Sequence, residues 1–155
     1  MKIILTLSLL LFLYSCNDGS NLGGDYYYLP IYEAEDIGYP YGTIVYKSKE
    51  KNHFDEVLIY SDIEKINYNN QFVIVLQKPN KELMLKRIKD DLNNGNRQFD
   101  IKDSIPRIEK KYRKLFLNGK NYYIINKQNN KFFGPLNQKE FNNLKLHYDI
   151  KLDFN

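Results

Sequence analysis

Acidic side chains come closest to a catalytic arrangement in this chain. They cluster at Glu33, Glu35 and Asp36, at Asp55 and Glu56, and at Asp90 and Asp91. Two carboxylates that face each other across a cleft can act as the acid and the base of a hydrolase. Sequence spacing does not set the distance between them, and solvated surface charges are the commoner reason for such clusters. A hydrolase that uses the cluster at 33–36 is therefore an alternative and not the first prediction.

Other catalytic and metal chemistries lack the residues that they need. Cys16 is the only cysteine, and the two histidines, His53 and His147, stand far apart in the sequence. Neither histidine belongs to a metal-binding spacing such as His-Glu-x-x-His, and a structural zinc site needs a ligand set that this chain lacks. We predict no catalytic residue, no metal site, no cofactor and no small-molecule ligand.

Cys16 follows a segment with the chemistry of a lipid-anchoring signal. Lys2 precedes an apolar stretch at 3–14, and twelve residues are too few to span about 30 Å of hydrocarbon. The tetrapeptide Leu-Tyr-Ser-Cys at 13–16 resembles the lipobox of bacterial lipoproteins, in which cleavage falls before the cysteine. In such proteins the thiol is alkylated with diacylglycerol and the freed amine can be acylated, palmitate being one such acyl chain. Two or more acyl chains anchor a protein stably. An ordinary secretory signal or a buried N-terminal strand is the alternative.

These features predict the domain organisation and the location of the protein. Residues 1–15 are expected to be a lipoprotein signal peptide, and the polar, glycine-rich residues 16–25 a flexible tether. Residues 26–155 are long enough to fold as a single domain. The expected location is the bacterial cell membrane, with the domain lipid-anchored through Cys16 and facing the periplasm or the cell exterior. In a Gram-negative host this would be the outer membrane.

Alternating and β-branched residues predict strands in two parts of the chain. The expected strands are 26–29, 43–46, 57–60, 63–68, 72–76, 122–125 and 132–133. The pair Asn69 and Asn70 tolerates a positive φ, so it predicts a tight hairpin with a primed turn. Gly134 and Pro135 are expected to close the last hairpin.

Helical spacing appears in three other segments. Leu85, Ile88 and Leu92 predict a helix that is capped by Asn80 and ends at Gly95. A second helix at 105–116 carries a basic outer face at Arg107, Lys110, Lys111, Arg113 and Lys114. The last helix has a capping box of Asn137 with Glu140 and a hydrophobic staple of Leu136 with Phe141. The fold class is α+β: an antiparallel meander of about five to seven strands, two central helices and a C-terminal helix.

Composition and charge exclude few partners. The 155 residues carry a formal net charge of +4, which is too small to select a polyanion. The basic helix face could contact nucleic acid in a cytoplasmic protein, but export removes that partner. Fourteen tyrosines and no tryptophan favour a protein surface over a sugar-binding one.

Several landmarks resemble those of a known family. They are the lipobox Cys16, then 21–29, 36–38 and 44–48, and late in the chain 122–127 and 131–136. Together they resemble a family of small bacterial lipoproteins of unknown function (DUF3997-like). The resemblance excludes roughly residues 80–118, and it implies a fold and an envelope location without catalytic residues.

The first functional prediction is a non-enzymatic, membrane-anchored module that binds a protein partner, with an immunity or inhibitor role as one form of it. Residues 26–32 and 39–46 are the predicted contact surface because they are rich in tyrosine. The singled-out side chains are Tyr27, Tyr28, Tyr39, Tyr41 and Tyr46. The alternatives are the envelope hydrolase and a purely structural envelope lipoprotein.

Overall fold

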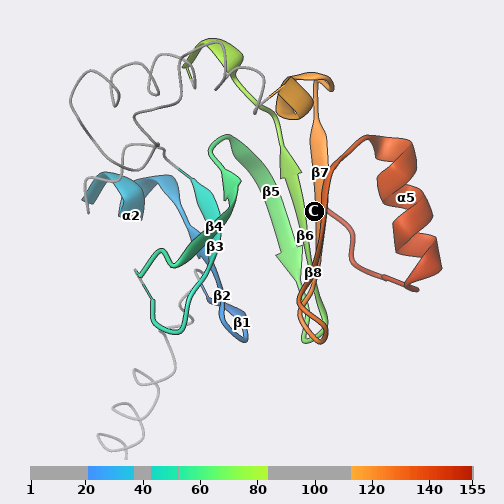
Figure 1. The fold of residues 1–155 in the computed structure, drawn as a ribbon, viewed down its shortest axis with the longest axis horizontal. Coiled ribbons are helices and arrows are strands. Elements are labelled where there is room, and N and C mark those ends of the chain that lie inside the picture. The colour runs from blue at the N-terminus through green and yellow to red at the C-terminus, as the bar shows by residue number, and fades with distance from the viewer. Residues whose placement is uncertain (1–20, 37–42, 52, 84–112, 155) are drawn as a thin grey trace, which may run out of the picture.

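Two antiparallel sheets of four strands each form the centre of the molecule in a computed structural model (Figure 1). The structure describes residues 21–36, 43–51, 53–83 and 113–154. The first sheet contains β1 (Asn21–Gly23), β2 (Tyr26–Leu29), β3 (Ile44–Lys47) and β4 (Glu56–Tyr60) in that order. The second contains β5 (Ile63–Tyr68), β6 (Phe72–Gln77), β7 (Asn121–Asn126) and β8 (Lys131–Leu136). The predicted α+β class with antiparallel strands is confirmed.

A sharp corner divides the strands into two sheets where a single meander was predicted. Ser61 and Asp62, between β4 and β5, have φ values of 45° and 55°. This left-handed pair turns the chain away from β4, so that β5 begins a new sheet and pairs with β6. The Asp62 carbonyl accepts the N–H of Lys78 at 3.0 Å, and the Thr43 hydroxyl accepts that of Ile63 at 3.0 Å. The prediction of one sheet with five to seven strands was therefore wrong in strand number and in layering.

The two sheets bury a shared core between them. Strand residues alternate between faces, so every second side chain points inward. The inward set is Leu22, Tyr26, Val45, Ile59, Val73, Val75, Tyr123 and Ile125. All are almost fully buried, which places the main apolar core between the sheets.

Each sheet is covered on its outer face as well (Figure 1). The helix α5 (Gln138–His147) and the C-terminal segment lie on the second sheet, where Phe141 and Ile150 contact Phe72, Ile74 and Ile124. The short helix α2 (Ile31–Asp36) lies on the first sheet through Ala34. Because both of its faces are covered, β6 is a continuous apolar run with no alternation.

A buried amide side chain connects the two sheets. Gln77, at the end of β6, donates through Nε2 to the carbonyls of Tyr60 at 2.6 Å and Ser61 at 3.0 Å. Its Oε1 accepts from the Tyr123 hydroxyl at 2.7 Å and from Asn121 Nδ2 at 3.1 Å. Gln77 thereby uses both ends of its amide, and no polar atom of this buried side chain lacks a partner.

Local signals at the helix starts are confirmed. The Asn137 side chain accepts from the Glu140 N–H at 3.0 Å, and the Glu140 carboxylate accepts from the Asn137 N–H at 2.8 Å. Leu136 and Phe141 meet in the same cluster, as expected for the staple. Asn80 accepts from the Leu83 N–H at 3.0 Å and caps a helix that begins at 81. The rest of the predicted helix that ends at Gly95 lies outside the described residues. So does most of the predicted basic helix, of which the described part is a 3₁₀ turn, η2 (Arg113–Phe116).

The last part of the predicted tether is structured. Residues 21–25, which we expected to be flexible, form β1 and its turn into β2. Leu22 is fully buried in the core between the sheets, which explains why this glycine-rich segment is ordered. Residues 1–20, with the predicted signal peptide, lie outside the described residues.

Two hairpin predictions were wrong in detail. Asn69 and Asn70 do not have positive φ, because the Asn69 side chain closes the turn by accepting from the N–H groups of Gln71 and Phe72. Gly134 and Pro135 do not close a hairpin either, since they lie inside β8 at an irregularity opposite Tyr123. Asn130, at the 127–130 turn, has the left-handed φ of 55° instead.

The described helices are short. No helix in residues 21–36, 43–51, 53–83 and 113–154 is long and apolar enough to cross a membrane.

Candidate functional site

The predicted tyrosine surface divides between core and solvent. Tyr46 is fully buried, and Tyr27 stacks on it with ring centroids 5.3 Å apart. Phe54 meets the other side of the Tyr46 ring edge-on at 4.9 Å. Tyr46 was therefore wrongly placed on the predicted surface: its ring fills the outer core of the first sheet. Tyr39 and Tyr41 lie outside the described residues.

An exposed apolar pair lies directly after β2. Pro30 ends the strand, and its carbonyl accepts the N–H of Ala34 at 3.0 Å to start α2. Since Ala34 is fully buried, the neighbouring side chains point away from the sheet: Ile31 is 50% exposed and Tyr32 is 62% exposed. Tyr32 lies inside the predicted range 26–32 but was not singled out. Pro30 is the signal that would have placed Tyr32 outside the sheet.

Tyr28 belongs to the inner face of the first sheet, whereas α2 covers the outer face. It packs against the inner cluster and remains partly exposed. Burial, and secondarily the Tyr32 phenol, raises the pKa of Tyr28. We call the exposed pair Ile31 and Tyr32 the α2 patch.

Acidic groups surround the α2 patch. Glu35 and Asp36 are exposed on the same helix. Glu33 pairs with Lys51 at 3.5 Å, and this ion pair ties α2 to the loop between β3 and β4. The arrangement is an aromatic and aliphatic centre with a mainly anionic edge.

The carboxylates have partners other than one another. The Lys51 ammonium faces Glu33, and Asp55 accepts from the Ser48 hydroxyl at 2.9 Å. Asp90 and Asp91 lie outside the described residues. Glu33 and Asp55, each from a different predicted cluster, are thus bonded to a base and to a hydroxyl and not to a second carboxylate.

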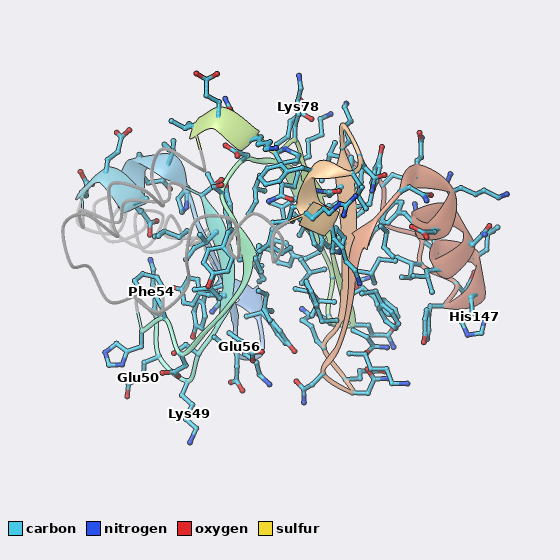
Figure 2. The ribbon with its side chains drawn as sticks, turned by 45° about the horizontal axis from the view of Figure 1, so that its top comes forward. Lys49, Glu50, Phe54, Glu56, Lys78 and His147 are labelled. Atoms are coloured by element: carbon cyan, nitrogen blue, oxygen red, sulfur yellow. The ribbon has the colours of Figure 1, made fainter. Side chains whose placement is uncertain are left out.

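The two histidines lie on different sides of the molecule. His53 is 3.9 Å from the exposed carboxylate of Glu50, and His147 lies edge-on to Tyr148 in the last turn of α5. Figure 2 shows Glu50 and His147 at opposite sides of the structure. In the described part of the chain no three His, Cys, Asp or Glu side chains are grouped as metal ligands.

A shallow depression of about 410 Å³ lies between α5 and the C-terminal segment. Its charged side chains are paired with each other, Lys145 with Asp153 and Lys151 with Asp149. None of the predicted carboxylates or tyrosines lines it.

Most of the described elements lie in a region that matches a known protein family. Residues 24–155 match the family described as Protein of unknown function (DUF3997). The chain belongs to this family. The resemblance predicted from the sequence is thereby confirmed. Neither a curated protein nor a solved structure matches the chain.

The DUF3997 match places the α2 patch inside the family region. It begins at Gly24, in the turn before β2, and includes the patch, the Gln77 network and α5. β1 precedes the matched region. The family carries no assigned activity and no enzyme family matches, so DUF3997 membership supplies no catalytic residue for this chain.

Proposed function

We propose that this DUF3997 protein is a lipid-anchored, non-enzymatic module of the bacterial envelope that binds a protein partner through the α2 patch. An immunity or inhibitor role is one form of this function. The proposed location is the bacterial cell membrane, with the domain facing the periplasm or the cell exterior. The proposed anchor is the acylated Cys16.

The exposed pair Ile31 and Tyr32 is the observation that carries the proposal. Water-exposed tyrosine on a rigid element is a typical centre of a protein interface, because a large ring is buried with little loss of conformational freedom. The buried Ala34 and the ion pair between Glu33 and Lys51 hold α2 in place. A rigid patch of this kind is already in its bound geometry, which lowers the entropic cost of association.

Charge defines the kind of partner. Glu35 and Asp36 border the α2 patch and carry no neighbouring exposed base on their own helix. The complementary surface is therefore an apolar pocket bordered by Lys or Arg. Tyr27, stacked on Tyr46, packs in the same cluster as Ala34 of α2.

Crosslinking in the natural envelope tests the binding function. The tagged, lipidated protein is crosslinked in membranes of its own host, and bound proteins are identified by mass spectrometry. We expect one stoichiometric protein, and we expect Tyr32→Ala to reduce its recovery by about 30-fold, the usual loss at a hot-spot residue.

Leu146→Ala is the matched control, because Leu146 on α5 is 81% exposed and lies far from α2. It should retain the partner. Equal loss in both variants, or no enrichment over an unrelated lipoprotein, contradicts binding through the α2 patch.

Fractionation tests the anchor separately. Cys16→Ala removes the thiol that would carry the diacylglycerol and should move the protein from the membrane fraction to the soluble fraction. Continued sedimentation of this variant with membranes contradicts anchoring through Cys16.

A further inference from the structure

β1 is a very short strand that is held from two sides. It pairs with β2 through only two residues, Asn21 and Gly23. Such a short edge strand forms few backbone hydrogen bonds and separates easily from its sheet. Leu22 nevertheless inserts fully into the core, so contacts from outside the first sheet contribute to its position.

The additional contact comes from the turn between β7 and β8. Lys127 Nζ crosses the gap between the sheets and donates to the Leu22 carbonyl at 2.6 Å. The backbone N–H of Lys127 is itself bonded to the Gln71 carbonyl at 2.8 Å, and its ammonium lies 5.8 Å from the centre of the Tyr68 ring. The base of this side chain is thus fixed to the second sheet while its end is bonded to the first.

Gly23 leaves the space for this side chain. A Cβ at position 23 would lie 2.8 Å from Lys127 Nζ, and the φ of Gly23 is +87°. The backbone angle favours glycine, and a Cβ at this position would displace the ammonium of Lys127 from its contact. Lys127 is partly buried at this contact, and this burial lowers the pKa of its ammonium.

The same turn reaches the next two strands. Asn130 Oδ1 accepts from the Tyr26 hydroxyl at 3.0 Å and from Lys47 Nζ at 3.2 Å. Figure 1 shows the β1–β2 and β7–β8 hairpins at the same end of the molecule. The turn at 127–130 therefore contacts β1, β2 and β3, with Lys127 as its contact to β1.

We propose that Lys127 clasps β1 to the second sheet and thereby fixes where the folded domain begins relative to its lipid anchor. This inference rests on the proposed acylation of Cys16 for its consequence at the membrane, and on the described contacts alone for the clasp. It also explains why a segment with the composition of a tether is a strand.

The clasp sets the reach of the domain from the bilayer. With β1 in place, five residue steps separate Cys16 from the first clasped residue, which allows at most about 18 Å of extended chain. With β1 released, ten steps lead to Tyr26, and the limit rises to about 36 Å. A closed clasp holds the hairpin end of the domain close to the lipid headgroups.

Hydrogen exchange of the full-length protein in detergent tests the clasp itself. Lys127→Met removes the ammonium and keeps a long apolar side chain, and Lys131→Met is the matched control on exposed β8. We expect amide exchange in 22–27 to accelerate roughly 10- to 100-fold in Lys127→Met, the range for a lost hydrogen bond to a charged group. Unchanged exchange in that variant, or equal acceleration in the control, overturns the proposal.

Lys127→Met could also lose its protection from amide exchange throughout β6 and β7. A second pair of variants tests the clasp in that case. Gly23→Ala displaces Lys127 Nζ, whereas Gly24→Ala also adds a Cβ at positive φ but has its nearest neighbouring atom at 3.9 Å. Faster exchange in 22–27 with Gly23→Ala than with Gly24→Ala supports the clasp. Equal exchange in the two variants overturns it.

Energy transfer on vesicles tests the consequence at the membrane. Gln128→Cys introduces a thiol for a donor dye on the exposed turn, because Cys16 is the only natural cysteine and the proposed lipid would block its thiol. The vesicles contain acceptor-labelled lipids. Energy transfer from the dye at position 128 to these lipids should be lower in the protein that also carries Lys127→Met. Equal transfer overturns the effect on reach, whereas a protein that does not bind the vesicles at all contradicts the anchor and leaves the exchange result standing.

Discussion

The backbone of Gly134, in the irregular part of β8, lies unusually close to the ring of Tyr123. Gly134 has a φ of +143°, and a Cβ at this position would lie 2.2 Å from Tyr123 Cδ1. Tyr123 has no room to withdraw, because its hydroxyl is bonded to Gln77 and its ring stacks on Phe132 at 5.7 Å. The space between the Gly134 backbone in β8 and the Tyr123 ring in β7 therefore admits a hydrogen atom but not a methyl group.

Replacing this glycine should destabilise the fold. We expect Gly134→Ala to lower the free energy of unfolding by about 2–4 kcal/mol, from the clash with Tyr123 together with the strained φ. Urea unfolding measures this loss. Gly119→Ala is the control, since a Cβ there meets no atom within 4 Å, and it should stay within about 0.5 kcal/mol of the wild type. Similar losses in both variants would contradict the assigned clash.

Tyr123 also predicts how stability depends on alkaline pH. Burial raises the pKa of the Tyr123 phenol well above its usual value of 10.0, and burial raises the pKa of Tyr26, Tyr28 and Tyr60 as well. Above pH 10 the unfolded chain loses these protons while the folded chain keeps them. The folded state then binds more protons, so its stability is complete below pH 10 and falls as the pH rises further.

Comparing the wild type with Tyr123→Phe measures the contribution of Tyr123 to the pH dependence of stability. At neutral pH the variant should be less stable by about 1 kcal/mol because it lacks the hydrogen bond to Gln77. Above pH 10 the wild type should lose stability more steeply, so the two unfolding curves measured against pH converge. Parallel curves at all alkaline pH values would exclude a raised pKa of Tyr123.

At the scale of elements, α5 and β1 are positioned by different kinds of interaction. The start of α5 is determined locally by the capping box of Asn137 and Glu140. The position of β1 depends on partners far along the chain, among them Lys127. Local elements of the first kind can be predicted from a few residues, whereas the second kind requires the assembled fold.

The capping box should have a measurable effect on stability. We expect Asn137→Ala to lower the free energy of unfolding by about 1 kcal/mol, because the Glu140 N–H loses its acceptor. Asn143→Ala, at an exposed position in the middle of the same helix, should be neutral or slightly stabilising since alanine favours helix. Thermal unfolding of both variants checks this difference, and a neutral Asn137→Ala would contradict the cap.

On the scale of the whole molecule, Gln77 is the polar connection between the sheets. Its amide joins β6 and β7 to the corner at Tyr60 and Ser61, where the chain leaves the first sheet. Because the network is buried, each atom that loses a partner remains without water. The relative position of the two sheets therefore depends on one side chain as well as on the apolar core.

Gln77→Leu should be among the most destabilising single substitutions. It removes the hydrogen bonds that Gln77 makes to the Tyr60 and Ser61 carbonyls and to the Tyr123 hydroxyl, and we expect a loss of about 3 kcal/mol or more. Gln71→Leu changes the same residue type at an exposed turn and should have little effect. Equilibrium unfolding in urea compares the two. A small effect of Gln77→Leu would show that the network does not connect the sheets energetically.

Much of the secondary structure follows from the sequence alone. Residues 26–29 and 63–68 were predicted as strands with the bounds that β2 and β5 have, and five other strands were found within a few residues of their ends. The caps at Asn80 and Asn137 were also predicted correctly. These features depend on the alternation of side chains and on hydrogen bonds between neighbours in the chain, which a sequence displays directly.

Tertiary structure decided the features that depend on distant residues. Alternating apolar residues predict a strand but not the sheet to which the strand belongs. The corner at Ser61 and Asp62 and the burial of Tyr46 could therefore not be predicted from the sequence. The glycine-rich composition of 21–25 predicts a tether. The segment is a strand because Leu22 contacts the core and Lys127, which are distant in sequence. The sequence by itself therefore determined the strands, the helix starts and the family. Only the folded chain decided the two sheets, the clasped β1 and the exposed pair on α2, because each depends on contacts between residues far apart in sequence.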